Sequence, residues 1–108
     1  MEAETLGPLQ AVWDAWDEVH ALVMAQPDSH FAAAIQLQLA EAAAEPVETR
    51  TKEVIDVISV ALNWLRYLGH TPESTAQAIR DRAGYRYAGQ SQAIFVKYRS
   101  IMKPEDIL

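Results

Sequence analysis

The sequence contains no cysteine among its 108 residues. Disulfides and thiolate metal sites are therefore excluded, and we expect a protein of a reducing compartment, the cytoplasm. Glycine is also scarce, with four residues spread along the chain, so there is no glycine-rich loop to hold phosphates. No apolar run approaches the ~20 residues of a membrane span. Residues 1–7 hold no basic residue of the kind that opens a signal peptide.

Basic residues are in the minority, nine against fifteen acids, and the formal net charge is −6. This balance argues against binding to a nucleic-acid backbone, which needs clustered Lys and Arg. It leaves room for a small nucleotide bound through a metal. Six of the nine basic residues come late and are interleaved with tyrosines, which indicates either a solvated last third or side chains that reach phosphate oxygens: Arg80, Arg82, Arg86, Lys97, Arg99 and Lys103.

Helix-forming residues dominate, strand alternation is absent, and half of the residues are hydrophobic. We expect an all-α fold, a bundle of four to five helices in a single domain over residues 1–108, with loose termini at 1–6 and 103–108. The first helix is expected from Pro8 to about Gln26. The others are expected at 28–45 behind Asp28 or Ser29, at 50–68 behind Thr49 or Thr51, at 72–84 and at 91–103, with a loop at 85–90.

The helix expected over residues 50–68 is apolar around most of its circumference. Such a wide arc predicts burial on more than one side, with one side covered by the bundle and the other by a second copy of the chain. A narrow polar stripe interrupts the arc, because residues three or four apart share a helical face: Asp56, Ser59, Asn63 and Arg66.

Two acidic pairs are the candidates for chemistry. Glu53 and Asp56 lie three residues apart on the 50–68 helix, and Glu41 and Glu45 lie four apart on the preceding one. Two packed helices can point these carboxylates into one cleft, where oxygen ligands suit Mg²⁺ and the ion suits a polyphosphate. The alternatives are structural: favourable acids at a helix start, a solvated helix face, or a salt bridge from Asp56 to Arg66 or Arg99.

Other residues read more simply. Glu48 is expected to pair with Lys52 at the next turn. The histidines lack metal-ligand spacing, and His30 and His70 are expected on the surface. The three tryptophans are expected in the core, with Trp64 the best candidate for stacking on a base.

The run Glu53-Val54-Ile55-Asp56, followed by apolar residues up to Gly69, resembles the second motif, ExxD, of the MazG-like nucleotide pyrophosphohydrolases. The order of elements is similar from about Phe31 to Arg99. The resemblance implies an all-α, oligomeric protein, commonly a dimer or a dimer of dimers. It also implies Mg²⁺-dependent hydrolysis of a nucleoside triphosphate to the monophosphate and pyrophosphate. The family's first motif, EExxE, is incomplete here: either Ala42 replaces its middle acid or Gln38 replaces a ligand.

Under this hypothesis Glu53 and Asp56 are catalytic and bind the metal with Glu41 and Glu45. A carboxylate or the metal then activates the attacking water. Asn63, Lys97 and Arg99 are expected to bind the substrate, the amide at the sugar or base and the two cations at the phosphates. The expected partners are a nucleoside triphosphate and a second copy of the chain, with no nucleic acid and no membrane. The alternative is a helical dimerisation or interaction module on the same scaffold that has lost the chemistry.

Overall fold

The computed structural model describes residues 5–99, and every regular element in this range is helical, which confirms the expected all-α class. None of the helices in this range is both long and apolar enough to cross a membrane. The contacts divide the chain after Thr75 into two compact units, and each is described by itself. Of the expected loose termini, residues 1–4 and 103–108 lie outside the described range, and Leu6 is buried.

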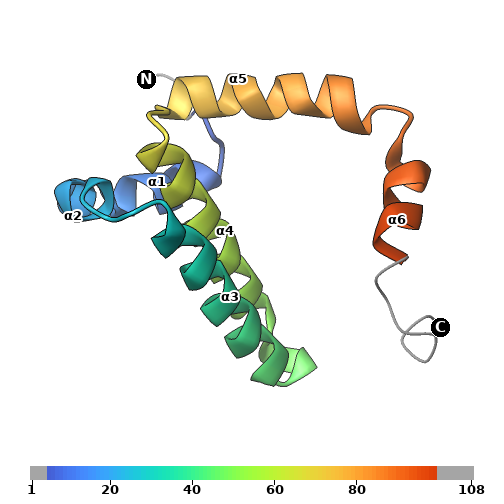
Figure 1. Ribbon diagram of the computed structural model, residues 1–108, viewed down its shortest axis with the longest axis horizontal. Helices are drawn as coiled ribbons and strands as arrows, with labels where there is room; N and C mark the ends of the chain where they lie inside the picture. The colour runs from blue at the N-terminus through green and yellow to red at the C-terminus, as the bar shows by residue number, and fades with distance from the viewer. Residues whose placement is uncertain (1–4, 100–108) are drawn as a thin grey trace. The chain divides into compact units, whose positions relative to one another are not determined.

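An antiparallel pair of helices, α3 (Ser29–Ala44) and α4 (Thr51–Tyr67), forms the body of the first unit (Figure 1). Phe31 at the start of α3 is fully covered. Its ring stacks on Trp64 at 6.1 Å between centroids and lies 4.9 Å from that of Tyr67, both near the end of α4. These aromatic contacts anchor one end of the pair. Trp64 also donates its indole N–H to Asp28, which therefore binds across the pair instead of capping α3.

The other end of the pair is closed by a short turn around Pro46. Glu45 and Pro46 adopt extended backbone and end α3, and a 3₁₀ turn (Val47–Thr49) leads into α4. Arg50 folds back over this turn, and its guanidinium donates to the carbonyl oxygens of Glu45 at 2.7 and 3.0 Å and of Ala43 at 3.3 Å. These carbonyls have no partner within α3, so Arg50 satisfies the helix end. The expected caps Thr49 and Thr51 make no capping bond to α4.

The single helix expected over residues 8–26 is wrong, because this segment is broken into three pieces. They are α1 (Leu9–Ala15), a 3₁₀ turn (Asp17–Val19) and α2 (His20–Met24). At the break Val19 leaves the helical region, with φ −116° and ψ 22°. The break lets Trp13 before it and Val23 after it both become buried in the first unit. Tertiary packing on α4 has overridden local helix preference here.

The apolar circumference of α4 is covered on two sides and open on a third. One side packs on α3, and α1 and α2 pack on another near its C-terminal half, where Leu62, Asn63 and Arg66 are buried. Val54, Ile55 and Ile58, in the N-terminal half, remain 49, 46 and 38% exposed. The expected burial on more than one side therefore holds for the second half of α4 within a single chain.

The second unit begins at Ala76 within α5 (Pro72–Arg82) and continues through a π-helical turn (Ala83–Tyr87) to α6 (Ser91–Arg99). The π-helical turn closes with a hydrogen bond from the Ala88 N–H to the Ala83 carbonyl oxygen. The loop expected at 85–90 is therefore wrong for its first half, because a wide helical turn carries the chain on. Gly89, with φ of +73°, then makes the sharp turn into α6.

Candidate functional site

The polar stripe of α4 meets the broken N-terminal segment. Ser59 accepts a hydrogen bond from the indole N–H of Trp16 at 2.9 Å. Arg66, only 5% exposed, donates at 2.8 Å to the carbonyl oxygen of Trp13 and to a carboxylate oxygen of Asp17. Its other terminal nitrogen lies 2.9 Å from His20 Nδ1. Two of the four stripe residues, Ser59 and Arg66, therefore tie the N-terminal segment to α4.

Asp56 begins the same stripe and is exposed. The alternative salt bridge from Asp56 to Arg66 is absent, because Arg66 pairs with Asp17 instead. Within residues 5–99 the Asp56 carboxylate makes no hydrogen bond or ion pair, which leaves it open to solvent and ligands. Because Asp56 is exposed, water can solvate its charge, and the carboxylate needs no partner within the protein.

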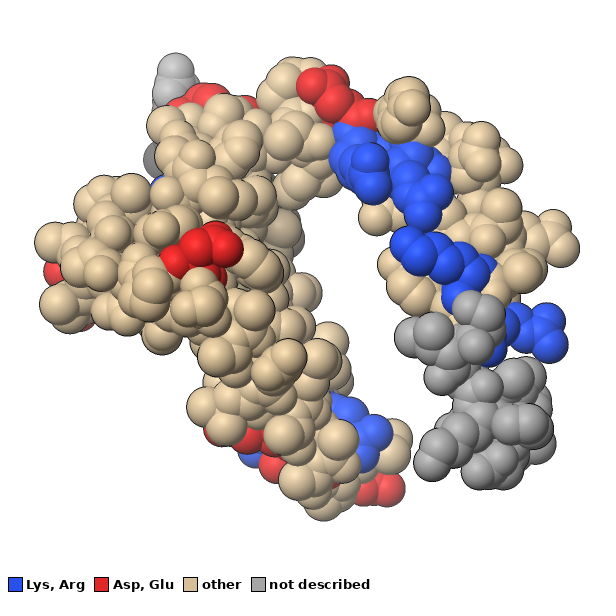
Figure 2. Space-filling view, in the orientation of Figure 1, with Lys and Arg blue, Asp and Glu red and all other residues tan. Residues whose placement is uncertain are grey.

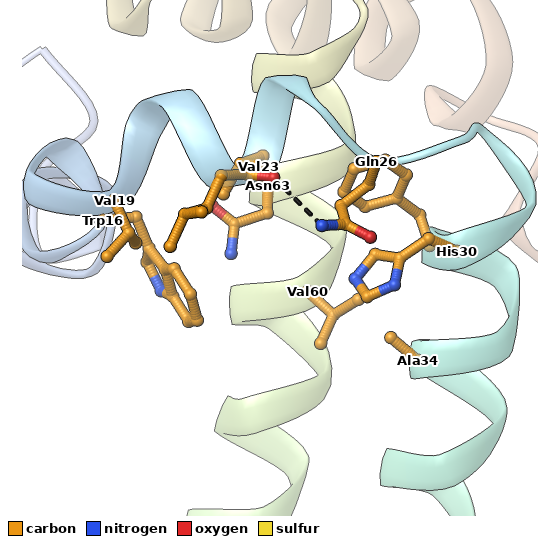
Figure 3. A pocket seen from close by; sticks show the side chains of 10 residues that line it. Trp16, Val19, Val23, Gln26, His30, Ala34, Val60 and Asn63 are labelled. Carbon is orange, nitrogen blue, oxygen red and sulfur yellow. Dashed lines mark hydrogen bonds between the residues drawn. The ribbon is translucent and has the colours of Figure 1, made fainter.

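A pocket of about 320 Å³ opens where α1 and α2 meet the α3–α4 pair. Figure 3 shows Trp16 and Val19 at one end, Gln26 and His30 at the other, and Asn63 and Val60 of α4 between them. Its walls are mainly apolar and aromatic, with two amide groups and one imidazole as polar groups, a composition typical of small-molecule sites. The lining residues are Trp16, Val19, Leu22, Val23, Gln26, His30, Phe31, Ala34, Val60 and Asn63.

Asn63 is the one expected site residue that lines this pocket, and it is 8% exposed. Sequence reasoning missed Trp16, Gln26 and His30 as pocket residues, because they meet only after the N-terminal segment breaks and folds over α4. Trp64, expected to be the best residue for stacking on a base, instead stacks on Phe31 and donates its indole N–H to Asp28. Trp16, expected in the core, is 37% exposed and presents its ring to the pocket.

The four expected metal ligands lie on the paired helices α3 and α4 or, for Glu45, at the end of α3. Glu41 is exposed on α3, and Glu53 is partly exposed on α4. Glu45 accepts a hydrogen bond from the Thr49 hydroxyl at 2.7 Å and pairs with Lys52 at 3.3 Å, so Lys52 does not pair with Glu48 as expected. Within residues 5–99 no three His, Asp or Glu side chains are placed to hold a metal ion together.

The environment of Glu45 acts on its acidity. The hydrogen bond from the Thr49 hydroxyl, followed by the hydrogen bond and charge of Lys52, lowers the pKa of the Glu45 carboxyl below its usual 4.5. Both interactions favour the ionised form. Glu45 is thus engaged in closing the turn between α3 and α4, which makes it the least available of the four acids for a ligand.

Lys97 and Arg99, the expected phosphate ligands, lie on α6 in the second unit. The ammonium nitrogen of Lys97 lies 5.6 Å from the centre of the Tyr98 ring. Both residues are therefore part of the second unit, whereas the four acids belong to the first.

Comparison of the chain with protein families, with curated proteins and with solved structures gives no match.

Proposed function

We propose that this chain binds a nucleoside triphosphate and hydrolyses it to the monophosphate and pyrophosphate with the help of Mg²⁺. The observation that carries the proposal is the position of two carboxylates relative to the pocket. Glu41 lies seven residues after the pocket-lining Ala34, and Asp56 lies seven residues before the pocket-lining Asn63. Seven residues make about two turns, or roughly 10.5 Å, so each acid shares the helical face that lines the pocket.

The two acids also stand at the same level of the helix pair. Glu45 and Lys52 are in contact beside the turn that joins the two helices. Glu41 on α3 and Asp56 on α4 each lie four residues farther from that turn, and the helices are antiparallel. A nucleotide spans a comparable length between its base and its phosphates. A base held beside Asn63 therefore leaves the phosphates within reach of the carboxylates.

The pocket suits a nucleobase in chemistry as well as in size. The Trp16 ring offers a flat apolar surface, and the Asn63 amide offers both a donor and an acceptor for the edge of a base. Gln26 uses one amide proton on the Leu22 carbonyl oxygen and keeps its own oxygen available (Figure 3). His30 adds a ring nitrogen at the rim.

The carboxylates would form a Mg²⁺ site only together with phosphate oxygens of the substrate. Because Glu45 is engaged with Thr49 and Lys52, the ion would bind through one or two of the remaining carboxylates, Glu41, Glu53 and Asp56. Mg²⁺ commonly binds through one or two carboxylates, with substrate phosphates and water completing its shell. When bound, the ion would offset the phosphate charge. Glu53 or Asp56 would then accept a proton from the attacking water.

The proposal is tested by measuring pyrophosphate release from a panel of canonical and modified nucleoside triphosphates with Mg²⁺. We expect Asp56→Asn and Glu53→Gln to lower turnover about 100-fold or more while nucleotide binding persists, because an acid–base group typically contributes that much. Asn63→Ala should instead weaken binding. Glu48→Gln is the matched control, since this exposed acid lies in the turn before α4. Wild-type release no faster than that of Asp56→Asn would overturn the proposal.

A second candidate is a dimerisation module, favoured by the open face of α4. Val54, Ile55 and Ile58 are about 40–50% exposed on consecutive turns, and Leu39 of α3 is 52% exposed. Contiguous exposed apolar residues commonly mark an interaction surface. A second copy of the chain would cover this face without any need for the acids.

Sedimentation equilibrium distinguishes the second candidate. Ile58→Lys should shift a dimer to monomer and leave the helical circular dichroism unchanged. Leu37→Lys is the control, because Leu37 is 60% exposed and lies roughly 160° around α3 from Leu39. A wild-type chain that stays monomeric at high micromolar concentration excludes the dimer.

A further inference from the structure

Charge is divided unequally between the two units. Residues 76–108 contain six cations and three acids, a formal charge of +3, whereas residues 1–75 contain three cations and twelve acids, a formal charge of −9. The net charge of −6 for the whole chain hides this division. The expectation against nucleic acid came from the whole-chain value, and that basis does not hold for residues 76–99.

Asp81, the one acid among residues 76–99, forms no ion pair with the arginines of that segment. Asp81 accepts a hydrogen bond from the side-chain amide of Gln77 at 2.7 Å, and Arg80 donates to the oxygen of the same amide at 3.0 Å. Among the described residues both ion pairs belong to the first unit. In Figure 2 the blue side chains of the second unit follow one another along the side in view.

Aromatic rings lie among these cations and are open to solvent. Tyr85 is 84% exposed, and Tyr87, Phe95 and Tyr98 are 51, 60 and 53% exposed. Within the π-helical turn, Tyr85 and Tyr87 flank Arg86 in the sequence. Large exposed rings have a cost in water, and a ring face is a platform on which an unpaired base can stack.

We propose that residues 76–99 bind single-stranded nucleic acid. The arginines of α5 and of the π-helical turn contact phosphates, and the tyrosine rings stack on unpaired bases. A positively charged track combined with aromatic platforms is the physical basis of sequence-tolerant binding to single strands. A duplex is a poorer fit, because its bases are already stacked and leave the tyrosine rings without a partner. The proposal is independent of the nucleotide site, since the pocket and its acids lie in the first unit.

Fluorescence anisotropy of the full chain with labelled 20-nucleotide single strands of DNA and RNA, and with a duplex of equal length, tests this proposal. The single strands should bind more tightly than the duplex. If three to five phosphates are neutralised, at about 0.7 logarithmic units of affinity per phosphate per tenfold change in salt, affinity should fall roughly 20- to 100-fold between 50 and 200 mM salt.

Variants separate the two parts of the surface. Arg82→Gln should weaken binding and reduce the salt slope by about 0.7. Tyr85→Ala should weaken binding about fivefold or more without changing the slope, and Tyr85→Phe should restore it, because stacking needs only the ring. Lys52→Gln is the control, since it removes one exposed cation from the acidic unit and should change neither value.

Each of three binding results would overturn the proposal, and a competition result would be a fourth. The three are no binding of single strands at 50 mM salt, equal or tighter binding of the duplex, and equal loss in Lys52→Gln and Arg82→Gln. Competition by polyglutamate as strong as that by the single strand would identify an acidic protein as the partner, and would also refute it.

Discussion

Replacing Arg66 with methionine removes the side chain that ties α4 to the broken N-terminal segment. Its guanidinium bonds to the Trp13 carbonyl oxygen, to Asp17 and to His20, and lies 4.7 Å from the centre of the Trp13 ring. Methionine keeps much of the apolar stem and removes every polar contact. We expect the variant to loosen α1 and α2 and to open the pocket that they wall.

The magnitude follows from the individual contacts. The hydrogen bond from a charged donor to the buried Trp13 carbonyl contributes about 1.5–3 kcal/mol, and the contact with the Trp13 ring adds about 0.5–2 kcal/mol. The Asp17 side chain is 61% exposed, so its ion pair contributes about 1 kcal/mol at most. Against these gains, Arg66 Nε is buried without a hydrogen-bond partner among the described residues. We expect Arg66→Met to lower the free energy of unfolding by about 3 kcal/mol.

The assay is urea unfolding followed by tryptophan fluorescence, with Arg66→Met, Asp17→Asn and the double variant compared as a cycle. Asp17→Asn should cost about 0.5 kcal/mol, and the coupling energy should stay below about 1 kcal/mol. The melting temperature of Arg66→Met should fall by more than about 10 °C. A cost of about 2 kcal/mol or more for Asp17→Asn would refute the reasoning, because the ion pair would then dominate.

Three further outcomes follow from contacts in the first unit. The lowered pKa of Glu45 means that its carboxylate, held by Thr49 and Lys52, stabilises the fold above about pH 4.5 and that this stabilisation is lost as the pH falls further. The melting temperature of Glu45→Gln should therefore fall less steeply than that of the wild type as the pH drops below about 4.5. Parallel curves of melting temperature against pH for the two proteins would contradict this. Gly69→Ala should cost about 1–2 kcal/mol in thermal unfolding, because Gly69 has φ of +97°. Trp64→Phe should cost about 1 kcal/mol through loss of its bond to an aspartate, measured in the same way.

The helices were predictable wherever the apolar spacing and the helix-ending Pro and Gly residues indicate the same boundaries. As expected, Pro46 lies between α3 and α4, and Gly69 lies between α4 and α5. The helical period of α4 places Ser59, Asn63 and Arg66 on one face. Local signals of this kind act within a few residues, so the sequence carries them directly. The all-α class and the polar stripe could therefore be read without coordinates.

The break in the N-terminal segment was not predictable from its own residues. Its apolar spacing is helical throughout, and the partners that bend it, Ser59 and Arg66, lie more than 40 residues away. The pocket shares this origin, because Trp16 and Asn63 meet only after the bend. The exposure of Asp56 was not predictable for a related reason: the wide apolar arc predicted burial there, but Ile55 and Ile58 beside it are exposed in the single chain.

The Arg50 clasp over the turn has a consequence for the order of folding. It joins atoms five to seven residues apart, so the loop that it closes costs little chain entropy and can form on the fastest timescales of a polypeptide. The bonds from Arg66 to Trp13 and from Trp16 to Ser59 close loops of 53 and 43 residues. The paired helices should therefore be assembled before the N-terminal segment docks. During synthesis, that segment emerges before α4 and must wait for the surface that bends it.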